Sequence, residues 1–314
     1  MKSDEKKIDK NIEKKVADEL GIKMNMGGVN RTKIGDVIFV ILCLIVIVIC
    51  ILPMINLLAK SLSGSDYLVK REVYLIPKGF TFGAYKTVLS DMKYIWAFVW
   101  TAILTVVGTL LSLTMTLLCA YPLIFDKLKG RNAFNIIITI TMFFNAGTIP
   151  EYLLMKSLHL LNNPLVLVLP YCLSVFNMII MKNFFFGIPL SLRESAEMDG
   201  ASFFQVLWKI YIPLSKPVIA TLALFYAVGR WNGYSDALMF VKEPKFYPIQ
   251  LLLYNIINNI NSVDVATQEG FTTPGLSEAL KAAVVMFSTI PILCVYPGLQ
   301  KYFIQGVTVG AVKE

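Results

Sequence analysis

The sequence predicts an all-α membrane protein with six transmembrane helices. Of its 314 residues, 56% are apolar and only 16% are charged, which is far from the composition of soluble proteins. The apolar residues also gather in runs of about 20, the length at which a helix crosses about 30 Å of hydrocarbon. Strands of a transmembrane β-barrel would instead alternate over about ten residues. These observations exclude a soluble enzyme, a nucleic-acid-binding domain and a β-barrel.

Six apolar runs mark the expected spans. The first begins after 36 residues and lacks a small-x-small cleavage site, so we expect it to remain as a helix and not to be removed as a signal peptide. The stretch Gly147–Pro150 should kink or break the third span before Glu151. In chain order the spans are Val37–Ala59, Tyr94–Leu118, Ala133–Met155, Pro164–Met181, Pro217–Gly229 with an extension at either end, and Ala282–Gln300.

Basic residues lie beside the apolar runs, where positive charge sets the orientation of a membrane protein. The short segments that count most are the tail before the first span and the loop with Lys127, Lys129 and Arg131. We therefore expect residues 1–35 and 305–314 to be cytoplasmic tails and residues 36–304 to form the transmembrane domain. The net charge of +8 is explained by this pattern, so it does not imply nucleic acid.

The N-terminal tail has a narrow apolar stripe at four-residue spacing among charged side chains. On a helix this stripe would lie along one face, where it could contact the membrane surface. A solvated, partly helical tail explains the same residues, because most of Met1–Leu20 is polar, charged or small. The stripe consists of Ile8, Ile12, Val16 and Leu20.

The expected spans lack the groups that ion-coupled transport and intramembrane catalysis need. Their central portions contain no Lys, Arg, Asp or Glu, whereas proton- or ion-coupled carriers usually place carboxylates there. No nucleophile has a base nearby, and the only histidine, His159, lies in an outer loop. The cysteines show no zinc-site spacing and are expected to be packing residues: Cys43, Cys50, Cys119, Cys172 and Cys294. The sequence thus predicts no catalytic residue, no metal and no cofactor bound by this chain.

Neutral polar and aromatic side chains in the spans are the candidate contacts for a solute. Amides bond hydroxyl groups and aromatic faces stack on sugar rings, so such residues suit a neutral, hydroxyl-rich solute. Hydrogen bonding and packing between helices would explain the same residues without a solute. The candidates are Asn145, Tyr171, Ser174, Asn177, Tyr226, Trp231 and Asn232, the last two directly after Arg230.

A polar loop between the fourth and fifth spans predicts a short docking helix. Ser191 followed three residues later by Glu194 is a capping-box pattern just after Pro189, so a helix should begin there. One turn apart, Ala196 and Gly200 would form a smooth strip for close approach. Glu194 and Glu197 would add acidic charge on one side, and apolar knobs would follow at Phe203, Phe204 and Leu207.

This loop resembles the Glu-Ala-Ala loop of ABC-importer permeases, whose pattern is Glu-x-Ala, then Gly, nine residues, and Ile-x-Leu-Pro. Ser195 and Ile212 replace an alanine and a leucine of that pattern, both conservatively. The matching positions are Glu194, Ala196, Gly200, Ile210 and Pro213, with Asp199 before the glycine.

Three further segments extend the resemblance over about residues 33 to 314. They are similar to carbohydrate-importer permeases related to the maltose-system inner permease, and most of all to the lipoprotein-associated branch that handles complex oligosaccharides. The segments are Asn177–Met181, Pro213–Pro217, and Gln300–Phe303 with Gly306 and Gly310.

The resemblance implies a type I ABC importer permease fold in the bacterial cytoplasmic membrane, with a coupling helix at about residues 190–207. The partners implied are a second homologous permease, two ABC ATPase subunits that bind ATP and Mg, and an extracellular solute-binding lipoprotein that delivers a carbohydrate. The chain itself has no Gly-x-x-x-x-Gly-Lys-Ser/Thr loop for ATP. The ATPase-coupling residues implied are Glu194, Ala196, Glu197, Asp199, Gly200, Phe203 and Phe204.

Two questions stay open at this point. An ion- or proton-coupled carrier or channel for a small neutral solute is the alternative function, although intramembrane carboxylates that would favour it are absent. The outer loop, residues 233–280, is far longer than the connection that two helices need. We expect it to fold partly as a helix or hairpin and to contact the binding protein as a scoop through Asn258–Gly270, or else to be a lid on the partner permease.

Overall fold

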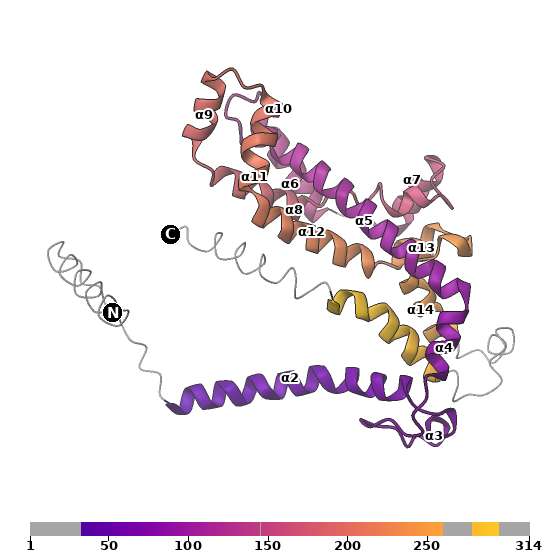
Figure 1. Cartoon of the computed structure of the whole chain (residues 1–314). Helices are drawn as coiled ribbons and strands as arrows, with labels where there is room; N and C mark the ends of the chain where they lie inside the picture. Colours follow the sequence, from indigo (N-terminus) through magenta and orange to yellow (C-terminus); the bar gives the residue numbers. More distant parts are fainter. Residues whose placement is uncertain (1–32, 145, 260–277, 295–314) are drawn as a thin grey trace. The chain divides into compact units, whose positions relative to one another are not determined.

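The structure is a computed structural model that describes residues 33–144, 146–259 and 278–294 (Figure 1). Every regular element in these ranges is helical, as the sequence predicts. The apolar stripe of the N-terminal tail, Asn145, most of the segment Asn258–Gly270 and the C-terminal tail 305–314 lie outside the described residues.

In chain order the helices are α2 (Lys33–Ser61), α3 (Ser65–Val69), α4 (Gly83–Ser90), α5 (Met92–Ala120), α6 (Arg131–Phe143), α7 (Thr148–Ser157), α8 (Val175–Phe186), α9 (Leu190–Met198), α10 (Phe203–Val206), a π-helical turn (Leu207–Tyr211), α11 (Ile212–Leu214), α12 (Lys216–Trp231), α13 (Ser235–Phe240), α14 (Ile249–Asn259) and a helix over residues 278–294. Short 3-10 turns lie at Pro122–Ile124, Pro164–Leu167 and Pro244–Phe246.

The chain divides into two compact units, residues 1–54 and residues 55–314. The described part of the first unit is the N-terminal portion of α2, whose apolar side chains are nearly all exposed. An apolar helix with an exposed surface is what a lipid-facing span requires. The pocket and the loop between α8 and α12 both belong to the second unit.

Two helical stretches among the described residues are long and apolar enough to cross a membrane unbroken, Val37–Ser61 and Met92–Ile124. They agree with the first two expected spans. Three further candidates are pairs of helices joined at a sharp bend, so the described residues hold two to five candidate spans. The pairs are α6 with α7, α8 with α9, and Phe203–Leu214 with α12. The sixth expected span is described only as far as residue 294.

The break predicted in the third span is present, because α6 ends at Phe143 and α7 begins at Thr148, before Glu151. The fourth span differs from expectation, since its α-helix begins only at Val175. Pro164 and Pro170 lack the backbone N–H that an α-helical ladder needs. The stretch 164–174 is therefore a 3-10 turn followed by irregular chain, although its composition is that of a span.

Helix α5 organises the second unit, because a single face of it is buried along its whole length. The buried residues recur every three or four positions, which is the period of one helix face. Along this face α5 packs against α12, α8 and α14, and Figure 1 shows α12 running beside it. The face consists of Tyr94, Ala97, Thr101, Leu104, Gly108, Ser112, Thr116 and Ala120.

Three apolar clusters follow one another along α5. The first, around Tyr94 and Ala97, gathers α3, α4, α14 and the helix 278–294. The second, around Leu104, gathers the 3-10 turn Pro164–Leu167, α13 and α14. The third, around Ala120, gathers α8, the chain after α9, and α12. Helix α5 is thus in contact with every other part of the unit that carries a candidate site.

The outer loop is anchored to α5 by hydrogen bonds from side chains of that helix. The Thr101 hydroxyl accepts a hydrogen bond from the Ile249 N–H at 2.8 Å and donates to the Ala97 carbonyl at 2.7 Å. The indole N–H of Trp100 donates to the Phe246 carbonyl at 2.9 Å. The expected helix in this loop is therefore present as α14, and it packs on α5.

We expect Thr101→Val to destabilise the protein, because it leaves the buried Ile249 N–H without an acceptor. Such a loss costs about 1–3 kcal/mol. The melting temperature of the purified permease should fall by several degrees. The control is Thr105→Val, since the Thr105 hydroxyl only donates to the Thr101 carbonyl within its own helix. Equal losses in both variants would contradict the anchoring role of Thr101.

Candidate functional site

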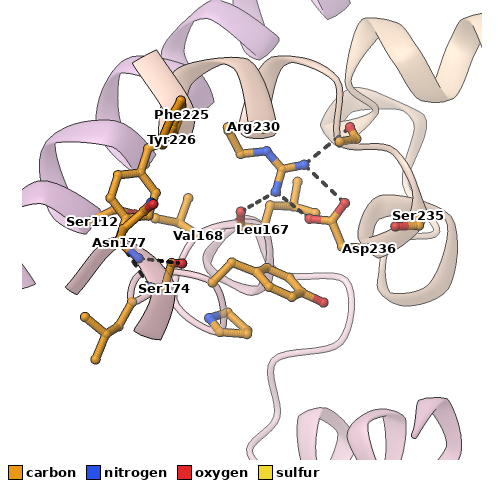
Figure 2. Close-up of a pocket in the computed structure, with 16 residues that line it drawn as sticks. Ser112, Leu167, Val168, Ser174, Asn177, Phe225, Tyr226, Arg230, Ser235 and Asp236 are labelled. Carbon is orange, nitrogen blue, oxygen red and sulfur yellow. Dashed lines mark hydrogen bonds and ion pairs between the residues drawn. The ribbon is translucent and has the colours of Figure 1, made fainter. Parts of the chain in front are cut away.

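A pocket of about 480 Å³ lies between α5, α8, α12 and the irregular stretch before α8 (Figure 2). Four of the predicted solute contacts line it together, although they come from three separate segments: Tyr171, Ser174, Asn177 and Tyr226. Ser112 and Ser235 add two further hydroxyl groups. The pocket thus collects hydroxyl, amide and aromatic groups, which are the groups that bind the hydroxyls and faces of a sugar.

Some of these polar groups also hold the pocket together. The Tyr226 hydroxyl lies 2.7 Å from the Thr116 hydroxyl and accepts a hydrogen bond from the Ser174 N–H at 3.2 Å. Ser174 in turn caps α8, because its hydroxyl accepts from the Asn177 N–H at 3.4 Å. Tyr226 therefore joins α12 to α5 and to the start of α8. Tyr226 thus both packs these helices together and lines the pocket.

An ion pair closes one end of the pocket. Arg230 and Asp236 have side chains that are only 11% and 7% exposed. The two terminal nitrogens of Arg230 bind the Asp236 carboxylate at 2.5 and 3.1 Å, and Nη1 also donates to the Leu167 carbonyl at 2.7 Å. Sequence reasoning missed this pair, although an arginine in the last turn of an apolar helix with an aspartate six residues later was a usable signal.

The other predicted solute contacts lie elsewhere. Trp231 is buried, donates its indole N–H to the Ser288 carbonyl at 3.0 Å and packs edge-on against Phe98. Asn232 is exposed just after α12 and does not line the pocket. Asn145 is outside the described residues. Near the pocket, the Tyr171 hydroxyl donates to Glu151 at 2.8 Å, which fixes Tyr171 toward α7.

The loop between α8 and α12 is helical, but it begins and breaks differently from the prediction. Helix α9 starts at Leu190 without a side-chain cap, so the capping box expected at Ser191 is not formed. The capping box is instead at the start of α10, where Ser202 and Gln205 bond each other's backbone N–H groups. The loop has two Ser-x-x-Glu/Gln patterns, at Ser191 and at Ser202, and only the second forms a capping box.

Gly200 divides the expected helix at about residues 190–207 into α9 and α10. Its φ of +78° is in the left-handed region, which glycine adopts without the strain that a Cβ adds. Its N–H donates to the Glu197 carbonyl at 3.1 Å, and the Ala201 N–H donates to the Ala196 carbonyl at 2.9 Å. These bonds terminate α9 as a glycine C-cap does.

One side of α9 is attached to the rest of the unit. The Arg193 side chain is only 17% exposed, and its guanidinium carbon lies 4.7 Å from the centre of the Phe125 ring. Ala196 packs against the same apolar cluster. The Tyr121 hydroxyl, at the end of α5, donates to the Phe203 carbonyl at 3.0 Å. Ala196 and Phe203, both expected on a free surface, thus contribute to the attachment.

The opposite side of the loop is an exposed surface with apolar and acidic side chains. Met198 is 88% exposed, Phe204 63% and Trp208 65%, and Glu194 is also exposed in this loop. Glu197 is exposed too, but it lies one turn from Arg193 and forms an ion pair with it at 3.4 Å. Leu207, expected to be an apolar knob, is 2% exposed and belongs to the core. Met198 and Trp208 were not singled out from the sequence, because an exposed methionine or tryptophan is indistinguishable there from a buried one.

Comparison with known proteins defines the class of this protein. Residues 92–309 match the family described as binding-protein-dependent transport system inner membrane component. Protein LplC of Bacillus subtilis (strain 168) is 41% identical over 267 residues, which cover 84% of this chain and 90% of LplC. The chain belongs to this family of inner-membrane transport components.

A second relative and a solved structure extend the comparison. The polygalacturonan/rhamnogalacturonan transport system permease protein YtcP of the same organism is 37% identical over 284 residues, which cover 90% of this chain and 99% of YtcP. The crystal structure of a bacterial ABC transporter involved in the import of the acidic polysaccharide alginate matches with a TM-score of 0.81 and 35% identity, over 86% of this chain and 97% of that one.

These findings confirm that the chain is a multi-pass inner-membrane permease with the ABC importer fold. It is a transport subunit and not itself an enzyme, and it works in a system that depends on a binding protein. The alternative of an ion- or proton-coupled carrier is thereby excluded. The solute contacts and coupling residues stay predictions.

We expect Gly200→Ala to loosen the end of α9, because alanine at positive φ costs about 1–2 kcal/mol. Apart from the adjoining chain, no atom lies within 4 Å of the position that a Cβ would take, so the effect is one of backbone conformation alone. Amide hydrogen exchange in the peptide that covers residues 190–202 should accelerate about tenfold. Gly200→Asn is the control, since asparagine tolerates this conformation, and it should exchange more slowly than the alanine variant. The reverse order would contradict the assignment.

Proposed function

We propose that this chain forms half of the membrane pathway of an ATP-driven importer for oligosaccharides or complex glycans. Two of the similar proteins support the substrate class, since one is named for polygalacturonan and rhamnogalacturonan and the other for alginate. The pocket between α5, α8 and α12 supports it independently. Its hydroxyl, amide and aromatic groups suit a saccharide, and its volume of about 480 Å³ suits one or two sugar rings.

In this proposal the chain pairs with a second homologous permease, and the pathway runs between the two. Two ABC ATPase subunits bind ATP and Mg on the cytoplasmic side, where both termini of this chain lie. An extracellular solute-binding lipoprotein delivers the sugar from outside the bacterial cytoplasmic membrane. The positive charges of Lys127, Lys129 and Arg131, just after α5, support this orientation, because short cytoplasmic segments are enriched in basic residues. Arg193 of α9 contacts Phe125 of the same segment, so α9 is proposed to lie on the cytoplasmic side as well.

The exposed surface of α9 and α10 is the observation that carries the coupling role. We assign it to docking on an ATPase subunit. Apolar side chains that become buried on binding dominate the energy of such contacts, and Met198, Phe204 and Trp208 are the most exposed apolar side chains of this loop. Glu194 and Asp199 add acidic charge that fits a basic partner surface, as does Glu197, which also pairs with Arg193 at 3.4 Å. Arg193, Ala196, Gly200 and Phe203 also hold the surface in shape, and Ala196, Gly200 and Phe203 stay predicted coupling residues.

The candidate pathway residues divide accordingly. Tyr171, Ser174, Asn177 and Tyr226 are proposed to contact the sugar in the pocket. Trp231 supports the pocket from the side through Phe98 and Ser288, and Asn232 and Asn145 stay contacts predicted from the sequence alone. A scoop role for the segment after α14 also rests on the sequence.

The docking surface can be tested by replacing Phe204 with alanine. We expect Phe204→Ala to weaken copurification of the ATPase subunits in mild detergent about tenfold, because an aromatic anchor contributes about 1–2 kcal/mol or more to such a contact. The matched control is Phe82→Ala, since Phe82 is 62% exposed and lies between α3 and α4 on the outer side. Identification of the copurified subunits by mass spectrometry completes the measurement. Loss of the ATPase in the control, or its full retention in Phe204→Ala, would contradict the proposed docking.

A further inference from the structure

The pocket contains one positively and one negatively charged lining residue, and each is bound to the other. Among the described residues that line it, Arg230 and Asp236 are the only charged ones. Figure 2 shows the guanidinium between Asp236 and the Leu167 carbonyl. The remaining lining is neutral, so the ion pair decides how the pocket treats a charged saccharide.

The Nη1–Nη2 edge of Arg230 is occupied by Asp236, and the remaining donor, Nε, is buried. A guanidinium binds a carboxylate best through two parallel N–H bonds, and Arg230 makes such a pair to Asp236 at 2.5 and 3.1 Å. Because Nε is buried, a uronate in the pocket would need the edge that Asp236 occupies. It would also face the negative charge of Asp236 and lose its hydration without gaining a free cation.

The position of Arg230 does not depend on Asp236 alone. A Cβ at Gly108 would lie 3.6 Å from Cγ of Arg230, so the arginine stem packs directly on α5. At Gly233 a Cβ would lie 2.7 Å from Nη2, so the turn after α12 is shaped around the guanidinium. The Leu167 carbonyl holds Nη1 from a third side. Removal of the Asp236 charge therefore leaves an arginine that is still fixed and still faces the pocket.

We propose that Asp236 masks Arg230 and makes this pocket select neutral saccharide units over uronates. The inference rests on the proposed function, because it concerns the same pocket. It gives Asp236 the role of a specificity-determining residue. Replacement of its carboxylate by an amide turns the pocket into a carboxylate-binding site centred on Arg230. The preference is opposite to what the names of the acidic-polymer relatives suggest for the permease itself.

The test uses two probes with the same sugar chain, trigalacturonic acid, whose carboxylates are charged at pH 7, and its neutral methyl ester. Binding of each probe to the purified complex of permeases and ATPases is measured at pH 7 by isothermal titration calorimetry. The binding protein is left out, because its own selectivity would otherwise contribute. We expect the wild-type complex to bind the ester at least tenfold more tightly than the acid. In Asp236→Asn the acid should gain at least tenfold and match or exceed the ester.

The double variant Arg230→Gln with Asp236→Asn is the control, and it should lose the gain for the acid. Equal binding of acid and ester by the wild type, binding of neither, or an acid gain that survives without Arg230 would overturn the proposal. The ratio of ester to acid affinity is measured on the wild-type complex. The proposal can therefore be contradicted even if the Asp236→Asn complex does not assemble. ATP hydrolysis by the same wild-type preparation is measured with and without loaded binding protein. If the loaded binding protein does not stimulate ATP hydrolysis, the proposed function is contradicted. If it does, but the acid and the ester bind equally, only the masking of Arg230 by Asp236 is contradicted.

Discussion

The close packing of α5 against α12 is the contact on which both candidate surfaces depend. The buried face of α5 has Gly108, Ser112 and Thr116 where α12 crosses it, and small residues let two helices approach closely. Arg230 lays its stem on Gly108, and the hydroxyls of Tyr226 and Thr116 meet at 2.7 Å. A larger residue on this face would separate the helices and open the pocket wall. Packing thus fixes the pocket before any solute binds.

The same helix connects the pocket to the outer loop and to the docking surface. Thr101 binds the start of α14, Gly108 and Ser112 line the pocket, and Tyr121 binds the Phe203 carbonyl. Thr101, Gly108 and Ser112 lie on one helix of 29 residues and Tyr121 caps its end, so their order along the chain is also their order in space. A displacement at one end of α5 therefore reaches the pocket without passing through a loop.

Composition and periodicity predicted most of the fold, since long apolar runs allow few structures in a membrane. The break before Glu151 also followed from the sequence, because Gly147 and Pro150 disfavour a continuous helix. The fourth span was placed too early because hydropathy does not register that Pro164 and Pro170 interrupt the backbone ladder. The choice between the capping boxes at Ser191 and Ser202 depended on Gly200, whose positive φ ends α9 and forces a second start.

The candidate site was predicted less completely than the fold, because the role of a charged or aromatic side chain depends on which residues it contacts. Tyr171, Ser174, Asn177 and Tyr226 were recognisable one by one, as polar groups in apolar runs. Arg230 and Asp236 were recognisable only as two charges six residues apart at the end of an apolar helix, because the role of each charge depends on its distance to the other. Exposure was equally hidden, so Phe204 and Leu207 looked alike until one proved 63% and the other 2% exposed.

The proposed docking surface and the pocket are joined by two links of different kinds. One is covalent, through the π-helical turn Leu207–Tyr211 and the sharp bend before α12. The other is noncovalent: Arg193 contacts Phe125, and the Tyr121 hydroxyl donates to the Phe203 carbonyl, both just after α5. ATP can shift a transporter between two states only if it binds one of them more tightly. In the proposed mechanism that difference has to appear at the pocket as a change in how α12 lies on α5. The bend before α12 and the Arg193 contact are the places through which a movement of the docking surface would reach α12 and α5.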